Sequence, residues 1–389
     1  MGSESQQVRD APCFTALWYL SMSVGYHRLW SHRSYRAGTY LELYLSIAGA
    51  ACFQGSIREW SIDHRAHHRY VDTDRDPYSI KKGFLYAHIG WLILKSNAER
   101  DRVDVTDLDA NRIVIWQHRN FVLIAVTAGL AFPSLIAWKF WNDWKGGFVY
   151  AGILRIFFFQ QATFCVNSLA HWLGDQPYDD KHSPRDHLLT ALVTFGEGYH
   201  NFHHEFPSDY RNGIEWYQYD PSKWLIWSWE KIKLANSLGR FPQNSIKKGE
   251  YQQQQKQLDK FKRSLDWGTP TSQLPLMTWK DFKGAAHNGH QLICISGFVY
   301  DVQSFVAWHP GGKAAITSCI GKDATAVFNG GIYSRMFGYL ISSIYAVRIC
   351  TCTNRRTDSN AAHSLLDEFR FGILLGGGEL AKEQDQSTT

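Results

Sequence analysis

The sequence predicts a mainly α-helical protein in two parts: an integral membrane helical domain with a cytosolic cap of clustered histidines, and a small α+β domain after it. Three observations predict this fold class. Two apolar runs are long enough to cross a bilayer, the histidine clusters lie close to them, and strand-like alternation begins only late in the chain. We expect the first domain over residues 1–240, a linker over 241–274, the second domain over 275–375 and a polar tail over 376–389.

The composition excludes several classes of protein. The chain has 389 residues, of which 44% are hydrophobic, 15% aromatic and 20% charged, unlike a disordered, collagen-like or small disulfide-rich protein. Its 41 basic and 36 acidic residues give a net charge of +5 without a basic block, so we expect no nucleic-acid partner. The seven cysteines show no framework spacing, and their odd number suits a reducing compartment.

Four apolar runs define the membrane-embedded half. Residues 13–24 are too short to span, and we interpret them as the cytosolic end of a span whose beginning is missing. Residues 41–53 are also short and suit a buried or interfacial helix. Residues 121–138 and 148–173 are long enough to cross, so they predict a transmembrane hairpin around 142–147.

Polar residues interrupt the second crossing run. Arg155, Gln160, Gln161 and Asn167 would be costly against lipid, so we expect them to face protein or a site. Asn167 lies one helical turn before His171. The amide of Asn167 could therefore hold a metal-bound water beside an imidazole from His171.

The histidines are the strongest signal in the chain. Positions i, i+3 and i+4 of a helix share one face, so an HxxHH cluster can aim three imidazoles at one point. Together with His171, the clusters offer enough nitrogens for two metal ions. The first cluster reads HxxxxH and the other two read HxxHH: His27 and His32; His64, His67 and His68; His200, His203 and His204.

Imidazole ligands suit zinc, copper, iron or nickel, and ligand type alone does not choose among them. No cysteine accompanies the clusters, which argues against a structural zinc site. A lone histidine is more often a hydrogen-bonded core or surface residue, and we interpret His88, His118, His182 and His187 in that way. Three clusters together are poorly explained by chance.

Longer strings around the clusters resemble a known family. GYHRLWSHRSYRA, REWSIDHRAHHRYVDTDRDPY, NSLAHWLGDQPYDD and GEGYHNFHHEFPSDYRNG are similar to the membrane-bound acyl-CoA desaturases, specifically the fungal Δ9 (stearoyl-CoA) type with a fused C-terminal cytochrome b5 domain. In that family nine histidines bind a di-iron centre on the cytosolic face of the endoplasmic reticulum membrane, and an asparagine contributes through water. The resemblance implies these ligands: His27, His32, His64, His67, His68, His171, His200, His203 and His204, with Asn167.

The resemblance also implies a reaction. The family uses O2 and electrons, which come from NADH through cytochrome b5 reductase, to place a cis double bond between C9 and C10 of a saturated acyl-CoA. Such a family member would turn stearoyl-CoA and palmitoyl-CoA into oleoyl-CoA and palmitoleoyl-CoA. Two alternatives stay open: a membrane lipid desaturase or hydroxylase of other regiospecificity, and an inactive truncated product, since family members carry about two spanning helices ahead of the first cluster.

The carboxylates and the basic residues near the clusters each have two possible roles. Asp76, Asp175, Asp179 and Glu197 either orient the histidine ligands through their second ring nitrogens or act as helix caps and surface partners. Basic residues in the same region are either contacts for the phosphates of coenzyme A or solvated charges. These are Arg58, Arg65, Arg69 and Lys95.

The late part of the chain resembles the cytochrome b5 haem-binding domain. HPGG at 309–312, preceded by GFVYDVQSFVAW and followed by GKDATAVF, makes His309 an expected axial ligand of haem b. The second axial histidine is missing, because Asp358 stands where the family has it, beside Ser359. This position is preceded by a foreign-looking segment, RMFGYLISSIYAVRICTCTNRRTD.

We hypothesise that most of 335–358 is a retained intron translated in frame. The codons available for Arg-Met-Phe and for Thr-Asp can contain a fungal intron start and end, and joining the outer bases restores a histidine codon. The repaired chain would read Tyr-Ser-His-Ser-Asn-Ala-Ala-His. The alternative is a genuine surface insertion with His363 as the second haem ligand.

Overall fold

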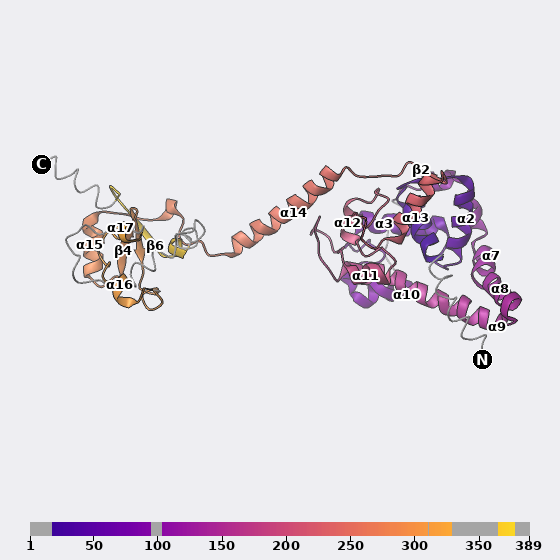
Figure 1. Ribbon diagram of the computed structural model, residues 1–389, viewed down its shortest axis with the longest axis horizontal. Coiled ribbons are helices and arrows are strands. Elements are labelled where there is room, and N and C mark those ends of the chain that lie inside the picture. Colours follow the sequence, from indigo (N-terminus) through magenta and orange to yellow (C-terminus); the bar gives the residue numbers. More distant parts are fainter. Residues whose placement is uncertain (1–17, 95–102, 310, 329–364, 378–389) are drawn as a thin grey trace. The chain divides into compact units, whose positions relative to one another are not determined.

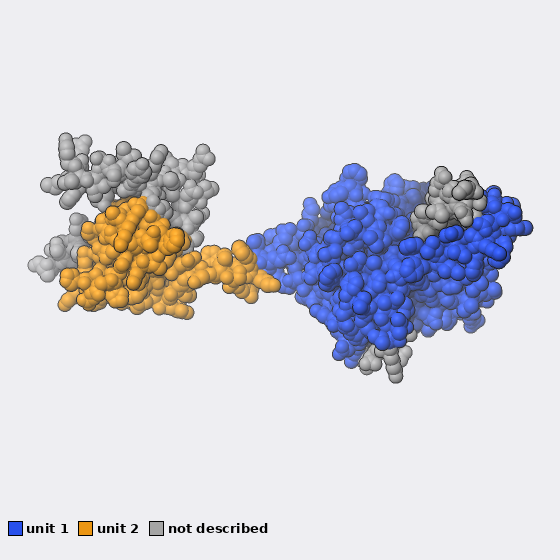
Figure 2. All heavy atoms as spheres, turned by 90° about the horizontal axis from the view of Figure 1, so that it is seen from below, with its two compact units in different colours: residues 1–258 blue, residues 259–389 orange. Residues whose placement is uncertain are grey.

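A computed structural model describes residues 18–94, 103–309, 311–328 and 365–377 (Figure 1). The chain divides into two compact units, Met1–Leu258 and Asp259–Thr389, which Figure 2 colours separately. The first unit is mainly helical and the second contains a small sheet, so the predicted fold class is confirmed. The segment 335–358, with Asp358, and His363 lie outside the described residues.

Three helices build the core beside the histidines. η1 (Met22–Ser31) is π-helical and buried along its whole length, and α2 (Thr39–Ala50) and α3 (Ile57–Tyr70) pack against it. α3 begins at a capping box, in which the Ser56 hydroxyl accepts from the backbone N–H of Glu59 and the Glu59 carboxylate accepts from that of Ser56. The box fixes the start of the helix that carries His64, His67 and His68.

Two helices are long and apolar enough to cross a membrane: Phe121–Trp141 and Trp144–His171. The first consists of α7 (Phe121–Val126), η5 (Thr127–Ala131) and α8 (Phe132–Trp141). The second consists of α9 (Trp144–Gly146), η6 (Gly147–Leu154), α10 (Arg155–Ser168) and η7 (Leu169–His171). Only 28% and 22% of their most apolar windows are buried, whereas the core helix of a soluble protein would be mostly buried.

The hairpin turns at Asn142, whose left-handed φ of 52° ends α8. The two helices then approach closely at Gly147, where an added Cβ would lie 2.4 Å from the Cβ of Ala137. Small residues allow such backbone approach between membrane helices. The predicted hairpin is therefore present, with its turn at the expected residues.

Of the four polar side chains that we expected to face protein or a site on the second crossing helix, Arg155 and Gln160 face protein. Arg155 is 2% exposed and donates to the carbonyl oxygens of Ala51 and Gly129. Gln160 donates to the carbonyl oxygens of Cys52 and Phe53. The bonds to Ala51, Cys52 and Phe53 join the hairpin to the chain that leads into α3, and the bond to Gly129 joins the two helices of the hairpin.

The segment after the hairpin carries the third histidine cluster on α12 (His200–Glu205). The Asp186 carboxylate accepts from the backbone N–H groups of Asn201 and Phe202, so it caps the start of this helix. Gly198 approaches α11 (Leu188–Val193) so closely that a Cβ there would lie 2.0 Å from the Ala191 nitrogen.

Further elements of the first unit connect or flank these helices. The strands β1 and β2 pair antiparallel, and α14 covers most of the predicted linker. The linker and domain boundaries themselves stay predictions. The elements are β1 (Arg36–Ala37), η2 (Ile80–Lys82), η3 (Tyr86–Gly90), α4 (Trp91–Ile93), α5 (Thr106–Ala110), α6 (Arg112–Arg119), α13 (Pro221–Lys231), β2 (Ala235–Asn236) and α14 (Gln243–Ser264).

The second unit has a four-stranded sheet in the order β3-β6-β5-β4. β4 and β5 form an antiparallel hairpin, β6 pairs antiparallel with β5, and β3 lies parallel to β6. Side chains from β4, β5 and α16 form part of the unit's hydrophobic core. The elements are η8 (Thr271–Gln273), β3 (Leu276–Met277), α15 (Trp279–His287), β4 (Leu292–Ile295), β5 (Phe298–Asp301), α16 (Lys313–Thr317), α17 (Thr325–Phe328) and β6 (Arg370–Leu374).

Candidate metal centre

All nine histidines singled out in the sequence come together in the first unit. They form two groups, and within each group the ring nitrogens that could serve as ligands lie within 4.8 Å of one another. We call these groups the five-histidine group and the four-histidine group. The first contains His27, His32, His64, His68 and His203, and the second contains His67, His171, His200 and His204.

Each HxxHH helix contributes to both groups. On α3, His64 and His68 belong to the five-histidine group, whereas His67 belongs to the four-histidine group. On α12, only His203 joins the five-histidine group. The groups are adjacent, since the rings of His68 and His204 stack with centroids 4.0 Å apart.

Distances between ring nitrogens show how tight the five-histidine group is. His203 Nε2 lies 3.0 Å from His27 Nε2 and 3.0 Å from His68 Nε2. His32 Nε2 lies 2.7 Å from His64 Nε2. In the four-histidine group, His200 Nε2 lies 3.1 Å from the Nε2 atoms of both His171 and His204.

The opposite ring nitrogens of several ligands donate outward. His27 Nδ1 lies 3.1 Å from a Glu197 carboxylate oxygen, and His67 Nδ1 lies 2.8 Å from Asp76 Oδ1. A neutral imidazole that donates through Nδ1 has only a lone pair at Nε2. The Nε2 atom of His67 is buried and has no hydrogen-bond partner among the described residues. Lone pairs converging in this way suit a bound cation, so the residues fit two metal ions.

Burial disfavours the charged form of several clustered histidines, and metal binding requires the neutral imidazole. Burial lowers the pKa of His200 to about 3, with a further lowering from the neighbouring histidines. Burial and nearby histidines also hold the pKa values of His64, His203 and His204 well below their usual range.

The four carboxylates considered in the sequence divide evenly. Asp76 and Glu197 hydrogen-bond the clustered histidines His67 and His27, which is the arrangement that an orienting role predicts. Asp175 instead pairs its backbone with Asp186, and Asp179 accepts from the backbone N–H of Lys181. In the part of the chain that the structure describes, neither of these two binds a clustered histidine.

Sequence reasoning missed the buried network behind Glu197. Arg28 is 1% exposed and donates to Glu197, to Asp220 and to the carbonyl oxygen of Tyr210. Burial raises the pKa of the Glu197 carboxyl, but its interactions with His27 and with the Arg28 guanidinium, and the hydrogen bond from Ser23, outweigh burial and hold this pKa well below its usual range. No local pattern points to Arg28, because its partners are distant in the sequence. Glu197, for example, lies 169 residues away.

Asn167 lies half-buried on α10, one turn before His171. The structure gives it no hydrogen bond to a clustered histidine within the described ranges. Its role as a ligand through water stays a prediction.

Two of the basic residues considered for phosphate contact are bound within the protein. Arg65 donates to Asp107 and to the carbonyl oxygens of Trp30 and Ser31, and Arg58 pairs with Asp109. Arg65 therefore acts as a structural residue that ties α3 to the end of η1. Arg69 lies over the ring of Tyr70, and Lys95 lies outside the described residues.

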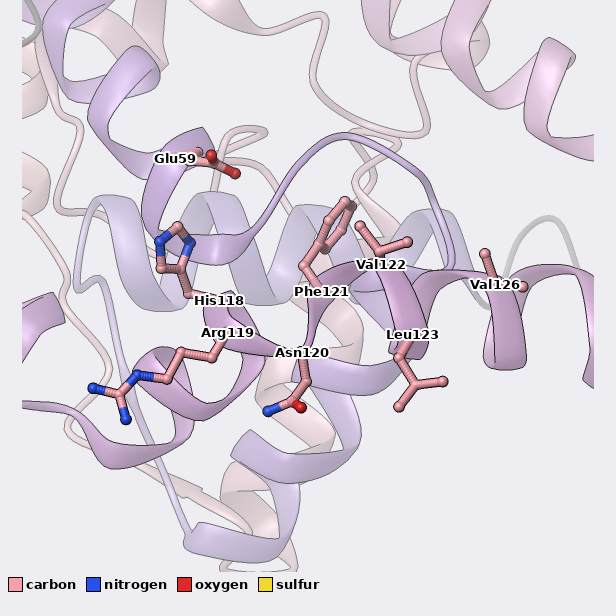
Figure 3. A pocket seen from close by; sticks show the side chains of 8 residues that line it. All are labelled: Glu59, His118, Arg119, Asn120, Phe121, Val122, Leu123 and Val126. Atoms are coloured by element: carbon pink, nitrogen blue, oxygen red, sulfur yellow. The ribbon is translucent and has the colours of Figure 1, made fainter.

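An open recess of about 680 Å³ lies where α6 leads into the first crossing helix (Figure 3). Its lining combines Glu59 and His118 with the apolar side chains of Val122, Leu123 and Val126. Arg119 points away from these apolar side chains in Figure 3. None of the nine clustered histidines lines the recess, so it is separate from the candidate metal centre.

His309 of the second unit lies in the loop before α16 and is half-exposed. Its Nδ1 atom lies 3.3 Å from the carbonyl oxygen of Gly312, and its ring lies edge-on to that of Phe305 at 5.6 Å. When Nδ1 donates its proton to a backbone carbonyl, Nε2 carries a lone pair, which fits the axial ligand of a haem. Asp358, the position of the second ligand, stays untested.

Comparisons with known proteins agree with this geometry. Residues 11–229 match the family model "Fatty acid desaturase", and residues 278–374 match "Cytochrome b5-like Heme/Steroid binding domain". The chain is 48% identical over 362 residues to a protein named "Probable acyl-CoA desaturase" from Schizosaccharomyces pombe, which covers 93% of this chain and 70% of the relative.

Two further relatives carry similar names. "Acyl-CoA desaturase 1" from Saccharomyces cerevisiae is 47% identical over 356 residues, covering 91% of this chain and 65% of that protein. "Stearoyl-CoA desaturase 5" from Homo sapiens is 42% identical over 213 residues, covering 53% of this chain and 64% of that protein. The chain therefore spans about two thirds of the length of these relatives.

Proposed function

Because the chain belongs to the fatty acid desaturase family and carries a C-terminal cytochrome b5 domain, we propose that it is an oxygen-dependent Δ9 acyl-CoA desaturase of the stearoyl-CoA type. The observation that carries the proposal is the convergence of nine histidines into two adjacent groups. The substrates would be stearoyl-CoA and palmitoyl-CoA, and the products oleoyl-CoA and palmitoleoyl-CoA.

The chemistry explains why metal ions are needed. An alkyl C–H bond has no acidity that a side-chain base could exploit, so two iron ions held by the histidine groups would supply the oxidising power together with O2. The protein's own residues hold the ligands and exclude water. His200 and His203 are each 1% exposed, and Glu197 and Asp76 fix the ring orientations of His27 and His67.

The second unit would supply the electrons. A haem b held by His309 would pass them on from NADH by way of cytochrome b5 reductase, which is the partner we propose. The match of residues 278–374 to the cytochrome b5 family supports this role, and so does the hydrogen bond from His309 Nδ1 to Gly312, which leaves a lone pair on Nε2.

We propose that the protein lies in the endoplasmic reticulum membrane as a multi-pass protein, with the metal centre and the haem domain in the cytosol. The two crossing helices support the membrane location. The second of them ends at His171, a member of the four-histidine group. Membrane lipid and an acyl-CoA are the remaining partners.

The proposal is tested by fatty-acid profiling of a yeast strain that lacks its own Δ9 desaturase. We expect cells that express the chain with 335–358 replaced by a single histidine to make oleate and palmitoleate with the double bond at C9. The unaltered chain, expressed in parallel, shows whether the segment is tolerated. Double bonds at another position would replace the Δ9 assignment by another regiospecificity, and their absence with both proteins in the membrane would contradict desaturation.

Replacing His309 by alanine is expected to remove haem from the second unit. The ring offers the iron ligand at Nε2, and alanine has no replacement for it. Haem per chain, measured from the Soret absorbance of purified protein in which a single histidine replaces 335–358, should fall to background. His287→Ala, at the end of α15 in the same unit, is the matched control and should keep its haem. Equal haem in both variants would show that His309 is not the ligand.

A further inference from the structure

The loop after α3 reaches both a histidine of the second cluster and a histidine at the end of the crossing helix. This loop runs over residues 71–78 and contains Asp72 and Asp76. Asp76 accepts from His67, and Asp72 contacts Ser183, which in turn contacts His171. His67 and His171 are both members of the four-histidine group. One loop therefore holds two of its four ligands.

The direction of each hydrogen bond follows from the donors available. Ser183 has a single hydroxyl proton, which it donates to Asp72 Oδ1 over 2.6 Å. The Ser183 backbone N–H donates to the other oxygen of the same carboxylate, also over 2.6 Å. The Ser183 hydroxyl oxygen must then accept from His171 Nδ1, at 2.7 Å. His171 consequently presents a lone pair at Nε2, toward His200 at 3.1 Å.

The two acidic side chains of the loop are themselves connected. The backbone N–H of Asp72 donates to Asp76 Oδ2 over 3.1 Å, while Asp76 Oδ1 accepts from His67. Asp72 has a left-handed backbone, with φ of 64°. Aspartate and asparagine tolerate this conformation better than other side chains apart from glycine. The left-handed backbone of Asp72 therefore belongs to the chain of hydrogen bonds that connects His67 with His171.

We propose that Asp72 and Ser183 are positioning residues that hold His171, together with His67, in the geometry needed to bind a metal ion in the four-histidine group. The inference rests on the proposed function in one respect, that the histidine groups bind metal. Carboxylates and hydroxyls that bind the outer nitrogen of a histidine ligand typically contribute 10–100-fold to metal affinity.

The effect should be selective for one of the two groups. The five-histidine group is supported from a different direction, by the bond between His27 and Glu197. Glu197 is bound by Ser23, Arg28 and Asn212, none of which belongs to the loop. Loss of the hydrogen bonds between Asp72 and Ser183 should therefore weaken the binding of one metal ion and leave the binding of the other unchanged.

The test measures ferrous iron in the purified full-length chain under anaerobic dialysis against rising chelator concentrations. Ser183→Ala and Asp72→Asn are expected to release one ion at about 10–100-fold less chelator than the unaltered chain. Ser183→Thr keeps a hydroxyl and should restore retention. Asp74→Asn changes an exposed carboxylate of the same loop and should behave as the unaltered chain.

Two results separate the positioning role from the proposed function. If the unaltered chain holds two iron ions and the Ser183→Ala and Asp72→Asn variants hold both equally firmly, the positioning role is wrong and the metal centre stands. Loss of both ions together from these variants also overturns the role, because it shows a general effect on the fold. If the unaltered chain binds no iron, the dinuclear centre and the positioning role fail together.

Discussion

Replacing His203 by alanine is expected to abolish desaturation. His203 is 1% exposed, and its Nε2 atom lies 3.0 Å from those of both His27 and His68, so it joins ligands of the first and second clusters. Residues that merely orient a histidine ligand contribute about 10–100-fold to metal affinity or activity. Loss of a ligand itself should therefore lower the desaturation activity at least about 100-fold. The measurements are oleate formed in the yeast strain without its own Δ9 desaturase and iron ions bound per chain.

His182→Ala is the matched control for this prediction. His182 is exposed, belongs to the same unit and is not a member of either histidine group. Its replacement should leave both oleate formation and iron content unchanged. If His203→Ala retained more than about a tenth of the activity together with full iron content, the five-histidine group would not be a metal site of the enzyme.

The parts of the structure that could be predicted are those that depend on neighbours in sequence. The crossing helices follow from long apolar runs, and the placement of His64, His67 and His68 on one side of α3 follows from helical periodicity. The expectation that the three imidazoles aim at one point is wrong, because His67 belongs to the other group. The capping box at Ser56 is likewise a local signal, since its two members are three residues apart.

The division of the ligands between two groups could not be predicted. His67 separates from its neighbours His64 and His68 because its ring lies beside those of His171 and His204, an arrangement that the sequence does not specify. The same holds for the outer partners of the ligands. Ser183 lies 111 residues from Asp72, and a serine or aspartate in a polar segment has no pattern that distinguishes it from a surface residue.

Replacing Arg28 by methionine is expected to destabilise the first unit strongly. The guanidinium of Arg28 binds both Glu197 and Asp220, which are 4% and 0% exposed, so its loss would leave two buried carboxylates without their cation. Breaking a buried ion pair in this way typically costs about 3–5 kcal/mol. For a domain of this size, the thermal unfolding midpoint in detergent should fall by roughly 6–20 °C.

The pH dependence gives this prediction a second readout. The folded-state pKa of Glu197 is lowered from its ordinary value of 4.5, so its stabilising contribution is present above that pH and is lost as the pH falls toward the folded-state value. The difference in thermal unfolding midpoint between the unaltered chain and Arg28→Met should therefore be largest at neutral pH and should decrease below about pH 4.5. Arg58→Met removes an exposed partner of Asp109 and should cost at most about 1 kcal/mol at any pH. Equal midpoints for the two variants would show that Arg28 does not hold the buried carboxylates behind His27.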